Sequence, residues 1–143
     1  VDRRLTHGET PESAVKELEA LESVQAAGAT VSILDYAVPA YTGLTYPTKK
    51  FYPTWVFPEE HPAVRAGVAA ATQALGRAPV VGKWGFSTNG IATAGMFNVP
   101  TIGFGPADEI YAHTPDDQCP VQDLTLAARF YAAFPQAYLA VAR

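Results

Sequence analysis

Apolar residues near the start of the chain recur at helical spacing. Thr10 offers an N-cap hydroxyl and Pro11 suits the first helical position, so the pattern predicts a helix that begins there. The residues expected on its inner face are Val15, Leu18, Leu21 and Val24. Gly28 predicts the end of this helix. Residues 1–6 and 29–36 have the composition of strands, so a β-α-β unit is expected at the start.

The middle of the chain combines proline with aromatic residues. Residues 38–58 contain four prolines, which suits an extended connector between two structural units better than a central strand. A second helix is expected from near Pro62 to Gly76. The residues predicted for its inner face are Val64, Val68, Ala71 and Leu75. A short strand is expected at residues 80–81.

The C-terminal half contains the densest run of glycine, aromatic and hydroxyl residues. Residues 84–90 lead into a short helix expected over residues 91–97, and residues 100–104 form a compact apolar run typical of a strand. The last helix is predicted at about residues 121–134, with Leu124, Ala128 and Tyr131 facing inward. Alternating strands and helices indicate an α/β or α+β chain, whose site we expect at the carboxyl ends of the later strands.

Composition narrows the class of protein. With 143 residues, 48% of them hydrophobic, the chain can bury one core or parts of two. A net charge of -4 without a long basic run argues against nucleic acid and anionic membranes as partners. Cys119 is the single cysteine, and no apolar stretch has the length of a membrane span, so a cytoplasmic location is expected. The chain starts at Val1 rather than Met, and we expect it to be part of a longer protein.

Residues 104–117 hold the most informative candidate for chemistry. His113 follows the predicted strand in a polar loop and could bind a metal as neutral imidazole, although a lone histidine is more often a surface or capping residue. Asp116 and Asp117 are expected to cap the last helix or to favour its N-terminal dipole. His7 and His61 are expected to be solvated.

Two familiar motifs do not match this sequence. The segment from Gly76 to Lys83 has five residues between its glycines rather than four and lacks Ser or Thr after the lysine, so it does not match a phosphate-binding loop. Ser87 lacks the second glycine of a nucleophile elbow, which argues against a catalytic serine.

Four blocks of the sequence, in their order and spacing, resemble one enzyme family. They are Asp2-Arg3-Arg4, the run from Phe86 to Gly90, the run from Val99 to Pro106, and the run from Ala112 to Asp117. The family is the zinc metallopeptidase and aminoacylase group that includes acetylornithine deacetylase and succinyl-diaminopimelate desuccinylase. The blocks most resemble its branch of hydrolases associated with selenium metabolism, and the run from Trp84 to His113 carries the most specific part.

The resemblance implies a fold and a division of the chain. Family members have an α/β catalytic domain of the zinc-exopeptidase type, into which a ferredoxin-like α+β lid or dimerisation domain is inserted. Residues 1–52 would then be part of the lid, and residues 53–143 would be the C-terminal half of the catalytic domain. A homodimer formed through the lid is expected.

The resemblance also implies roles for individual residues. His113 matches the family's last metal ligand in a site for two divalent ions, zinc by default, with manganese or cobalt as alternatives; such ions polarise the scissile carbonyl and generate hydroxide from water. Asp117 would lie next to this ligand, outside the metal's own coordination shell, and help to orient it. The substrate cleft would be lined by Ser87, Thr88, Asn89, Gly103 and Gly105.

This sequence departs from the family pattern in three respects. The family commonly has Asp where Asn89 stands and Glu where Asp117 stands. Its His-x-Asp pair, bridging Asp and adjacent Glu pair have no counterpart here. A catalytic zinc typically needs three protein ligands, so the isolated chain is expected to be inactive and to contain no catalytic residue of its own.

Two hypotheses follow. In the first, the chain belongs to a metal-dependent hydrolase that cleaves an N-acyl amino acid or a peptide-like amide, and the missing N-terminal part of the catalytic domain or a complementing chain supplies the other ligands. In the second, the chain is a non-catalytic dimerisation or scaffold module. An exposed strand edge at residues 1–6 would favour pairing with another chain.

Overall fold

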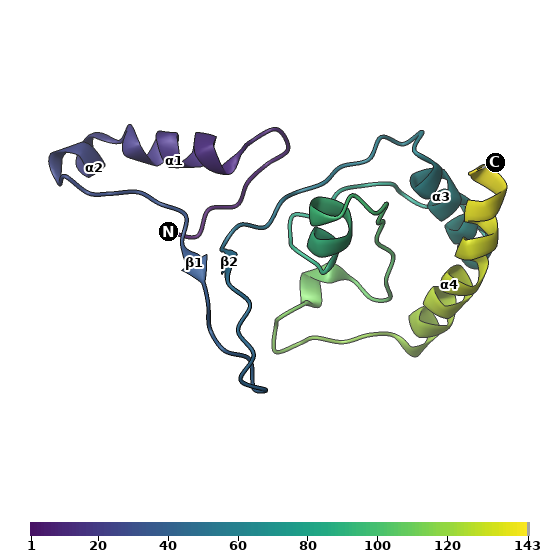
Figure 1. Cartoon of the computed structure of the whole chain (residues 1–143). Coiled ribbons are helices and arrows are strands. Elements are labelled where there is room, and N and C mark those ends of the chain that lie inside the picture. Colours follow the sequence, from purple (N-terminus) through teal and green to yellow (C-terminus); the bar gives the residue numbers. More distant parts are fainter. Residues whose placement is uncertain (143) are drawn as a thin grey trace. The chain divides into compact units, whose positions relative to one another are not determined.

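The computed structural model describes residues 1–142. The chain divides into two compact units, an N-terminal unit from Val1 to Trp55 and a C-terminal unit that starts at Val56 (Figure 1). The division falls near the expected boundary after residue 52. The described part of the chain contains no helix that is both long and apolar enough to cross a membrane.

The first helix predicted in the N-terminal unit is present, but it is divided into two shorter helices. Helix α1 spans Pro11–Glu19, and its capping box is complete: Thr10 Oγ1 accepts from the Ser13 N–H at 3.1 Å, and Ser13 Oγ accepts from the Thr10 N–H at 3.0 Å. Helix α2 spans Glu22–Ala26. The predicted start is confirmed, but continuity to Gly28 was wrong because Leu21 adopts extended backbone, with ψ of 129°.

The break also changes which helical face is covered. Ala14 is the one residue of α1 that is buried, whereas Val15 and Leu18 are half-buried. Leu21 is 47% exposed, contrary to the prediction. A helix interrupted after two turns cannot keep four apolar residues on a single stripe.

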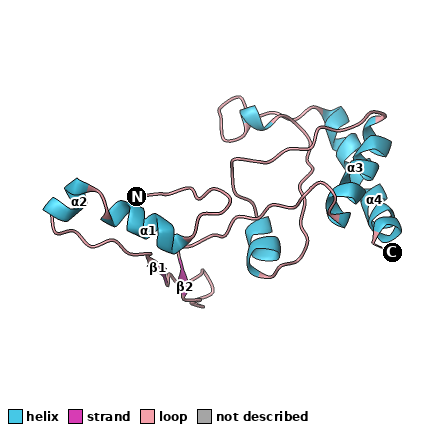
Figure 2. Cartoon of the chain, turned by 90° about the horizontal axis from the view of Figure 1, so that it is seen from above, coloured by secondary structure: helices cyan, strands magenta, loops and turns pink. Residues whose placement is uncertain are grey.

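A hairpin, rather than the expected β-α-β unit, supplies the strands of the N-terminal unit (Figure 2). Strand β1 (Asp35–Tyr36) pairs antiparallel with β2 (Thr48–Lys49), and Asp35 lies opposite Lys49, with Nζ and Oδ1 2.6 Å apart. The strands predicted over residues 1–6 and 29–36 were therefore wrong except at residues 35–36. The second strand instead comes from the proline-rich segment predicted as a connector.

Two helices build the core of the C-terminal unit (Figure 1). Helix α3 spans Pro62–Leu75 and ends at Gly76, whose φ of 69° is left-handed; both predicted ends are confirmed. Helix α4 spans Val121–Val141. Their contact is centred on a cluster of buried residues, namely Ala70, Ala71, Ala74 and Phe130.

The predicted inner faces of both helices need correction. On α3 the buried stripe is made of small residues and includes Ala71, as predicted, whereas Val64, Val68 and Leu75 are half-buried. On α4 the buried residues are Ala127 and Phe130, whereas Leu124 and Tyr131 are 52% and 58% exposed and Ala128 is exposed too. Alanines let the helices approach closely enough for the Phe130 ring to fill the contact, an arrangement that a search for large apolar residues misses.

The segment between the two helices contains short helices and no strand ladder. Ile91–Met96 forms a π-helix, labelled η1, whose last bond joins the Phe97 N–H to the Ala92 carbonyl at 3.0 Å; the predicted short helix is confirmed in place. Glu109–Tyr111 forms a 3-10 turn, η2. Residues 80–81 and 100–104 are not strands, because no segment among residues 1–142 supplies their ladder hydrogen bonds.

Candidate functional site

The turn at residues 87–90 is organised by Thr88. Its Oγ1 accepts from the Gly90 N–H at 3.1 Å, and its carbonyl accepts from the Ile91 N–H at 3.1 Å. These bonds start η1, so the turn geometry comes from the threonine side chain. Ser87 and Asn89 are exposed, while Thr88 is half-buried.

Gly103 lies against the six-membered ring of the Trp84 indole. A Cβ placed on Gly103 would be 2.0 Å from two carbons of the Trp84 ring, so only glycine permits this approach. The Trp84 ring also stacks with Phe86, with centroids 5.2 Å apart. The structure therefore brings the segment before the Ser87 turn against Gly103, two regions that are distant in the sequence.

Residues 102–105 are anchored to the helical core. The ring of Phe104 stacks on Phe130 with centroids 4.0 Å apart, and the Phe104 carbonyl accepts from the Tyr131 hydroxyl. The Ile102 side chain lies against Gly67 of α3. Gly103 and Gly105 therefore flank Phe104, which these contacts hold in place, and both glycines are exposed.

A hydroxyl contact ties η1 to the same segment. Thr101 Oγ1 donates to Thr93 Oγ1 at 2.7 Å. Together with the Trp84 contact, it connects both sides of the Ser87–Gly90 turn to residues 99–103. The five residues expected to line a cleft therefore belong to segments that the structure joins.

The loop that carries His113 has its own local hydrogen bonds. Asp108 Oδ1 accepts from the Ile110 N–H at 3.1 Å and so starts η2, and Thr114 Oγ1 donates to the Tyr111 carbonyl at 2.7 Å. Between these bonds His113 has a φ of 63°, a left-handed conformation that is uncommon for a residue with a side chain. Its imidazole is exposed and has no hydrogen-bond partner within residues 1–142.

The two acidic residues after His113 do not act as helix caps. The N-cap of α4 is Pro120, which makes no side-chain cap bond, so the predicted capping by Asp116 and Asp117 was wrong. Asp117 makes a backbone bond to the Thr114 carbonyl at 3.2 Å, and its side chain is exposed. No hydrogen bond in the described chain joins Asp117 to His113.

The described residues do not fit a metal ion by themselves. Among residues 1–142 there is no group of three or more His, Cys, Asp or Glu side chains that could hold one. His113 offers one imidazole, whereas a catalytic zinc site uses three protein ligands.

His61 has a structural role that was not predicted from the sequence. It is the N-cap of α3, where its Nδ1 accepts from the Ala63 N–H at 3.1 Å, and its ring stacks on Phe57 with centroids 4.3 Å apart. Its ring is half-buried rather than fully solvated as expected, and its position directly before Pro62 was the available signal. His7 is exposed in a turn, as predicted.

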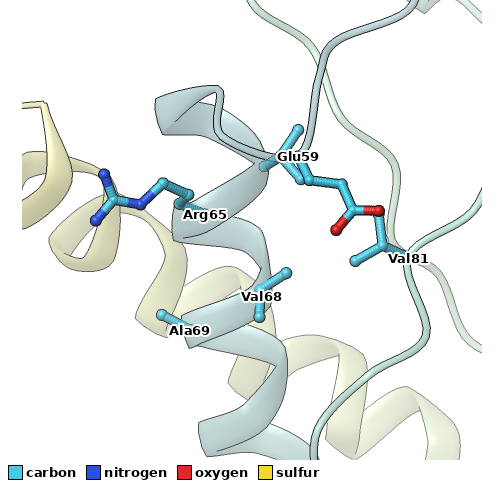
Figure 3. Close-up of a pocket in the computed structure, with 6 residues that line it drawn as sticks. Glu59, Arg65, Val68, Ala69 and Val81 are labelled. Atoms are coloured by element: carbon cyan, nitrogen blue, oxygen red, sulfur yellow. The ribbon is translucent and has the colours of Figure 1, made fainter.

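A hollow beside α3 lies apart from the predicted site residues. It is lined by Glu59, Val64, Arg65, Val68, Ala69 and Val81. Figure 3 shows the Glu59 carboxylate and Val68 directed toward Val81, while the Arg65 side chain points away. None of the residues expected to bind metal or substrate lines this hollow.

The chain was compared with protein families, solved structures and curated proteins, and two curated relatives match it. No protein-family model and no solved structure matches the chain. The chain is similar to the proteins named "Uncharacterized protein YgeY" from Escherichia coli strain K12 and from Escherichia coli O157:H7, each 48% identical over 140 residues. The match covers 98% of this chain and 35% of each relative, so the chain spans about a third of the length of the curated relatives it matches.

Proposed function

We propose that this chain is part of a metal-dependent amidohydrolase that cleaves an N-acyl amino acid or a peptide-like amide. The order and spacing of four sequence blocks support this proposal, because they resemble the zinc metallopeptidase and aminoacylase family throughout the chain. Residues 1–52 would belong to a lid that forms a homodimer, and residues 53–143 to the catalytic domain of a cytoplasmic enzyme.

The observation that carries the proposal is the state of the His113 imidazole. It is exposed, it has no partner within residues 1–142, and the Tyr111–Thr114 turn holds it on left-handed backbone. An unusual backbone conformation maintained at an unpaired imidazole is the kind of local cost found at binding sites. His61, in contrast, already uses its Nδ1 as a helix cap.

The proposal requires residues from outside the described chain. His113 would be one ligand of a site for two divalent ions, with Asp117 behind it, and the remaining ligands and the catalytic base would lie elsewhere in the longer protein or on a complementing chain. Ser87, Thr88, Asn89, Gly103 and Gly105 would line the cleft for the amide substrate. The isolated chain would be inactive.

Metal content of the complete protein tests the proposal. We expect the complete protein to bind zinc or manganese at micromolar metal and neutral pH, and His113→Ala to weaken that binding by at least tenfold. His7→Ala is the matched control, because His7 is also exposed but lies in the N-terminal unit. Absence of bound metal, or equal metal binding by both variants and the parent protein, would overturn the proposal.

A second candidate function is a dimerisation or scaffold module. It is favoured by the exposed apolar residues around the hairpin of the N-terminal unit, which are Leu34, Tyr36, Val38, Tyr41, Leu44 and Tyr46. The metal measurement separates the candidates, since a scaffold has no need of a divalent ion. Dimerisation without metal binding would favour the scaffold.

A further inference from the structure

The hollow beside α3 is formed by this helix and by the segments that precede and follow it in the sequence. Its volume is about 360 Å³, within the range of roughly 300–1,000 Å³ that small-molecule sites have. Val64 and Val68 lie four residues apart and therefore on one face of α3, and Val81 comes from the segment after the helix. With Ala69, these valines make four of the six lining residues apolar. The wall of the hollow is thus suited to an alkyl chain.

Glu59 brings a negative charge to this apolar wall. Figure 3 shows its carboxylate directed toward Val81, whereas the Arg65 side chain points away from the hollow. The Glu59 side chain is exposed and makes no ion pair or hydrogen bond within residues 1–142. The hollow therefore presents a carboxylate that has no cationic partner in the described chain.

The turn that carries Glu59 is fixed against the start of α3. Glu59 lies inside a turn closed by the His61 N–H, which donates to the Pro58 carbonyl at 3.0 Å. The His61 ring stacks on Phe57, and its Nδ1 caps α3. Because the backbone around Glu59 is already held in place, a ligand has to order little more than one side chain.

The residues of the hollow exclude several classes of ligand. An anion would meet the charge of Glu59, and a hard metal ion takes several oxygen ligands where the hollow offers one carboxylate. A quaternary ammonium is recognised by aromatic faces, and none of the six lining residues is aromatic. A primary ammonium, in contrast, donates charge-assisted hydrogen bonds to a carboxylate.

We propose that the hollow beside α3 binds a primary ammonium on a short unbranched alkyl chain. The ammonium would bond to Glu59, and the chain would cover Val64, Val68 and Val81 and remove apolar surface from water. None of the residues assigned to the metal or the amide substrate lines the hollow. This second site goes beyond the proposed function and does not depend on it.

Ligand-observed NMR titration of the complete protein with n-butylammonium tests the inference. We expect saturable binding that weakens about twofold for each methylene removed down to methylammonium, half the free energy of a fully buried methylene. Butyrate and butyltrimethylammonium should bind more weakly than n-butylammonium, because the first is an anion and the second has no hydrogen to donate.

Two variants locate the binding at the hollow. Glu59→Gln should weaken n-butylammonium binding about two- to fivefold, the range for an exposed ion pair. Glu60→Gln is the matched control, since it removes the same charge from the adjacent exposed residue, which does not line the hollow. Val81→Ser should reduce the gain in affinity between methylammonium and n-butylammonium.

The titrations also identify the source of the ammonium and can overturn the inference. Nα-acetyl-lysinamide carries the same group on a peptide unit, so tighter binding than n-butylammonium assigns the hollow to a lysine side chain and weaker binding assigns it to a free amine; both support the inference. No saturable binding, equal effects of Glu59→Gln and Glu60→Gln, or butyrate binding as tight as that of n-butylammonium would overturn it. Metal binding at His113 is measured separately and is unaffected by these outcomes.

Discussion

Glu9 shows how much one carboxylate can be stabilised at the surface of the N-terminal unit. Its oxygens accept from the Thr6 N–H at 2.6 Å, from Thr6 Oγ1 at 2.8 Å and from Arg3, which also bonds Glu17. The two bonds from Thr6 are the main reason that the pKa of Glu9 falls to about 2, and the side-chain bond from Arg3 adds to them. The bond to Glu17, followed by that to Glu9, raises the pKa of Arg3.

The lowered pKa of Glu9 predicts a pH dependence of stability. Because the charged carboxylate is favoured in the folded chain, its contribution is present above the ordinary pKa of 4.5 and is lost as the pH falls through about 2. Thr6→Val, which removes one of the two Thr6 bonds, should raise the pKa of Glu9 part of the way back. NMR titration of the carboxyl groups measures the pKa of Glu9 in the unchanged chain and in Thr6→Val. A Glu9 that titrates at its ordinary pKa in the unchanged folded chain would contradict the account.

The sequence predicts some features of the candidate site residues and not others. His113 could be selected as a candidate ligand because of its residue type and its polar loop, but its left-handed backbone leaves no mark in the sequence, since glycine is absent there. The Trp84 contact with Gly103 joins residues distant along the chain. Local patterns cannot report such a contact, although a glycine next to bulky residues is compatible with it.

At the scale of elements, α4 contains a residue that normally ends a helix. Pro135 lies inside Val121–Val141 and is exposed. The end predicted near Phe134, directly before Pro135, was wrong because packing of α4 against α3 continues beyond Pro135 through Ala137. Tertiary packing thus outweighs the local cost of a proline inside a helix.

This helix provides a stability prediction. Pro135→Ala should increase the free energy of unfolding of the chain by roughly 1–3 kcal/mol, because alanine restores the amide donor and removes the ring clash within α4. Urea unfolding followed by circular dichroism measures the change. Pro120→Ala, at the N-cap of the same helix, should change stability by only about 0.5 kcal/mol. An unchanged or lower stability of Pro135→Ala would count against this description of α4.

Strands were harder to predict than helices for a physical reason. The ends of α1 and α3 are set by local signals, a Thr10 hydroxyl at one and Gly76 at the other, and both were predictable. A strand needs a neighbour, so the apolar composition of residues 100–104 is not sufficient to make one. The pairing of Asp35 with Lys49, in contrast, depends on a turn within a segment whose prolines suggested a connector.

On the scale of the whole molecule, the two units differ in how much they bury. The C-terminal unit has a core around Ala70, Ala71 and Phe130, whereas Ala14 is the single buried hydrophobic residue described in the N-terminal unit. Many large apolar side chains are exposed in both units. Large exposed apolar patches indicate surfaces that partners or further chain can cover, which agrees with a proposal that needs residues outside this chain.

The position of the metal relative to His113 tests the central proposal most directly. Crystals of the complete protein grown with zinc should show an anomalous scattering peak at about 2.0–2.1 Å from a ring nitrogen of His113, the bonding distance for a histidine ligand. A zinc peak bonded to other residues with His113 out of bonding distance, or no bound zinc or manganese at all, would contradict the account.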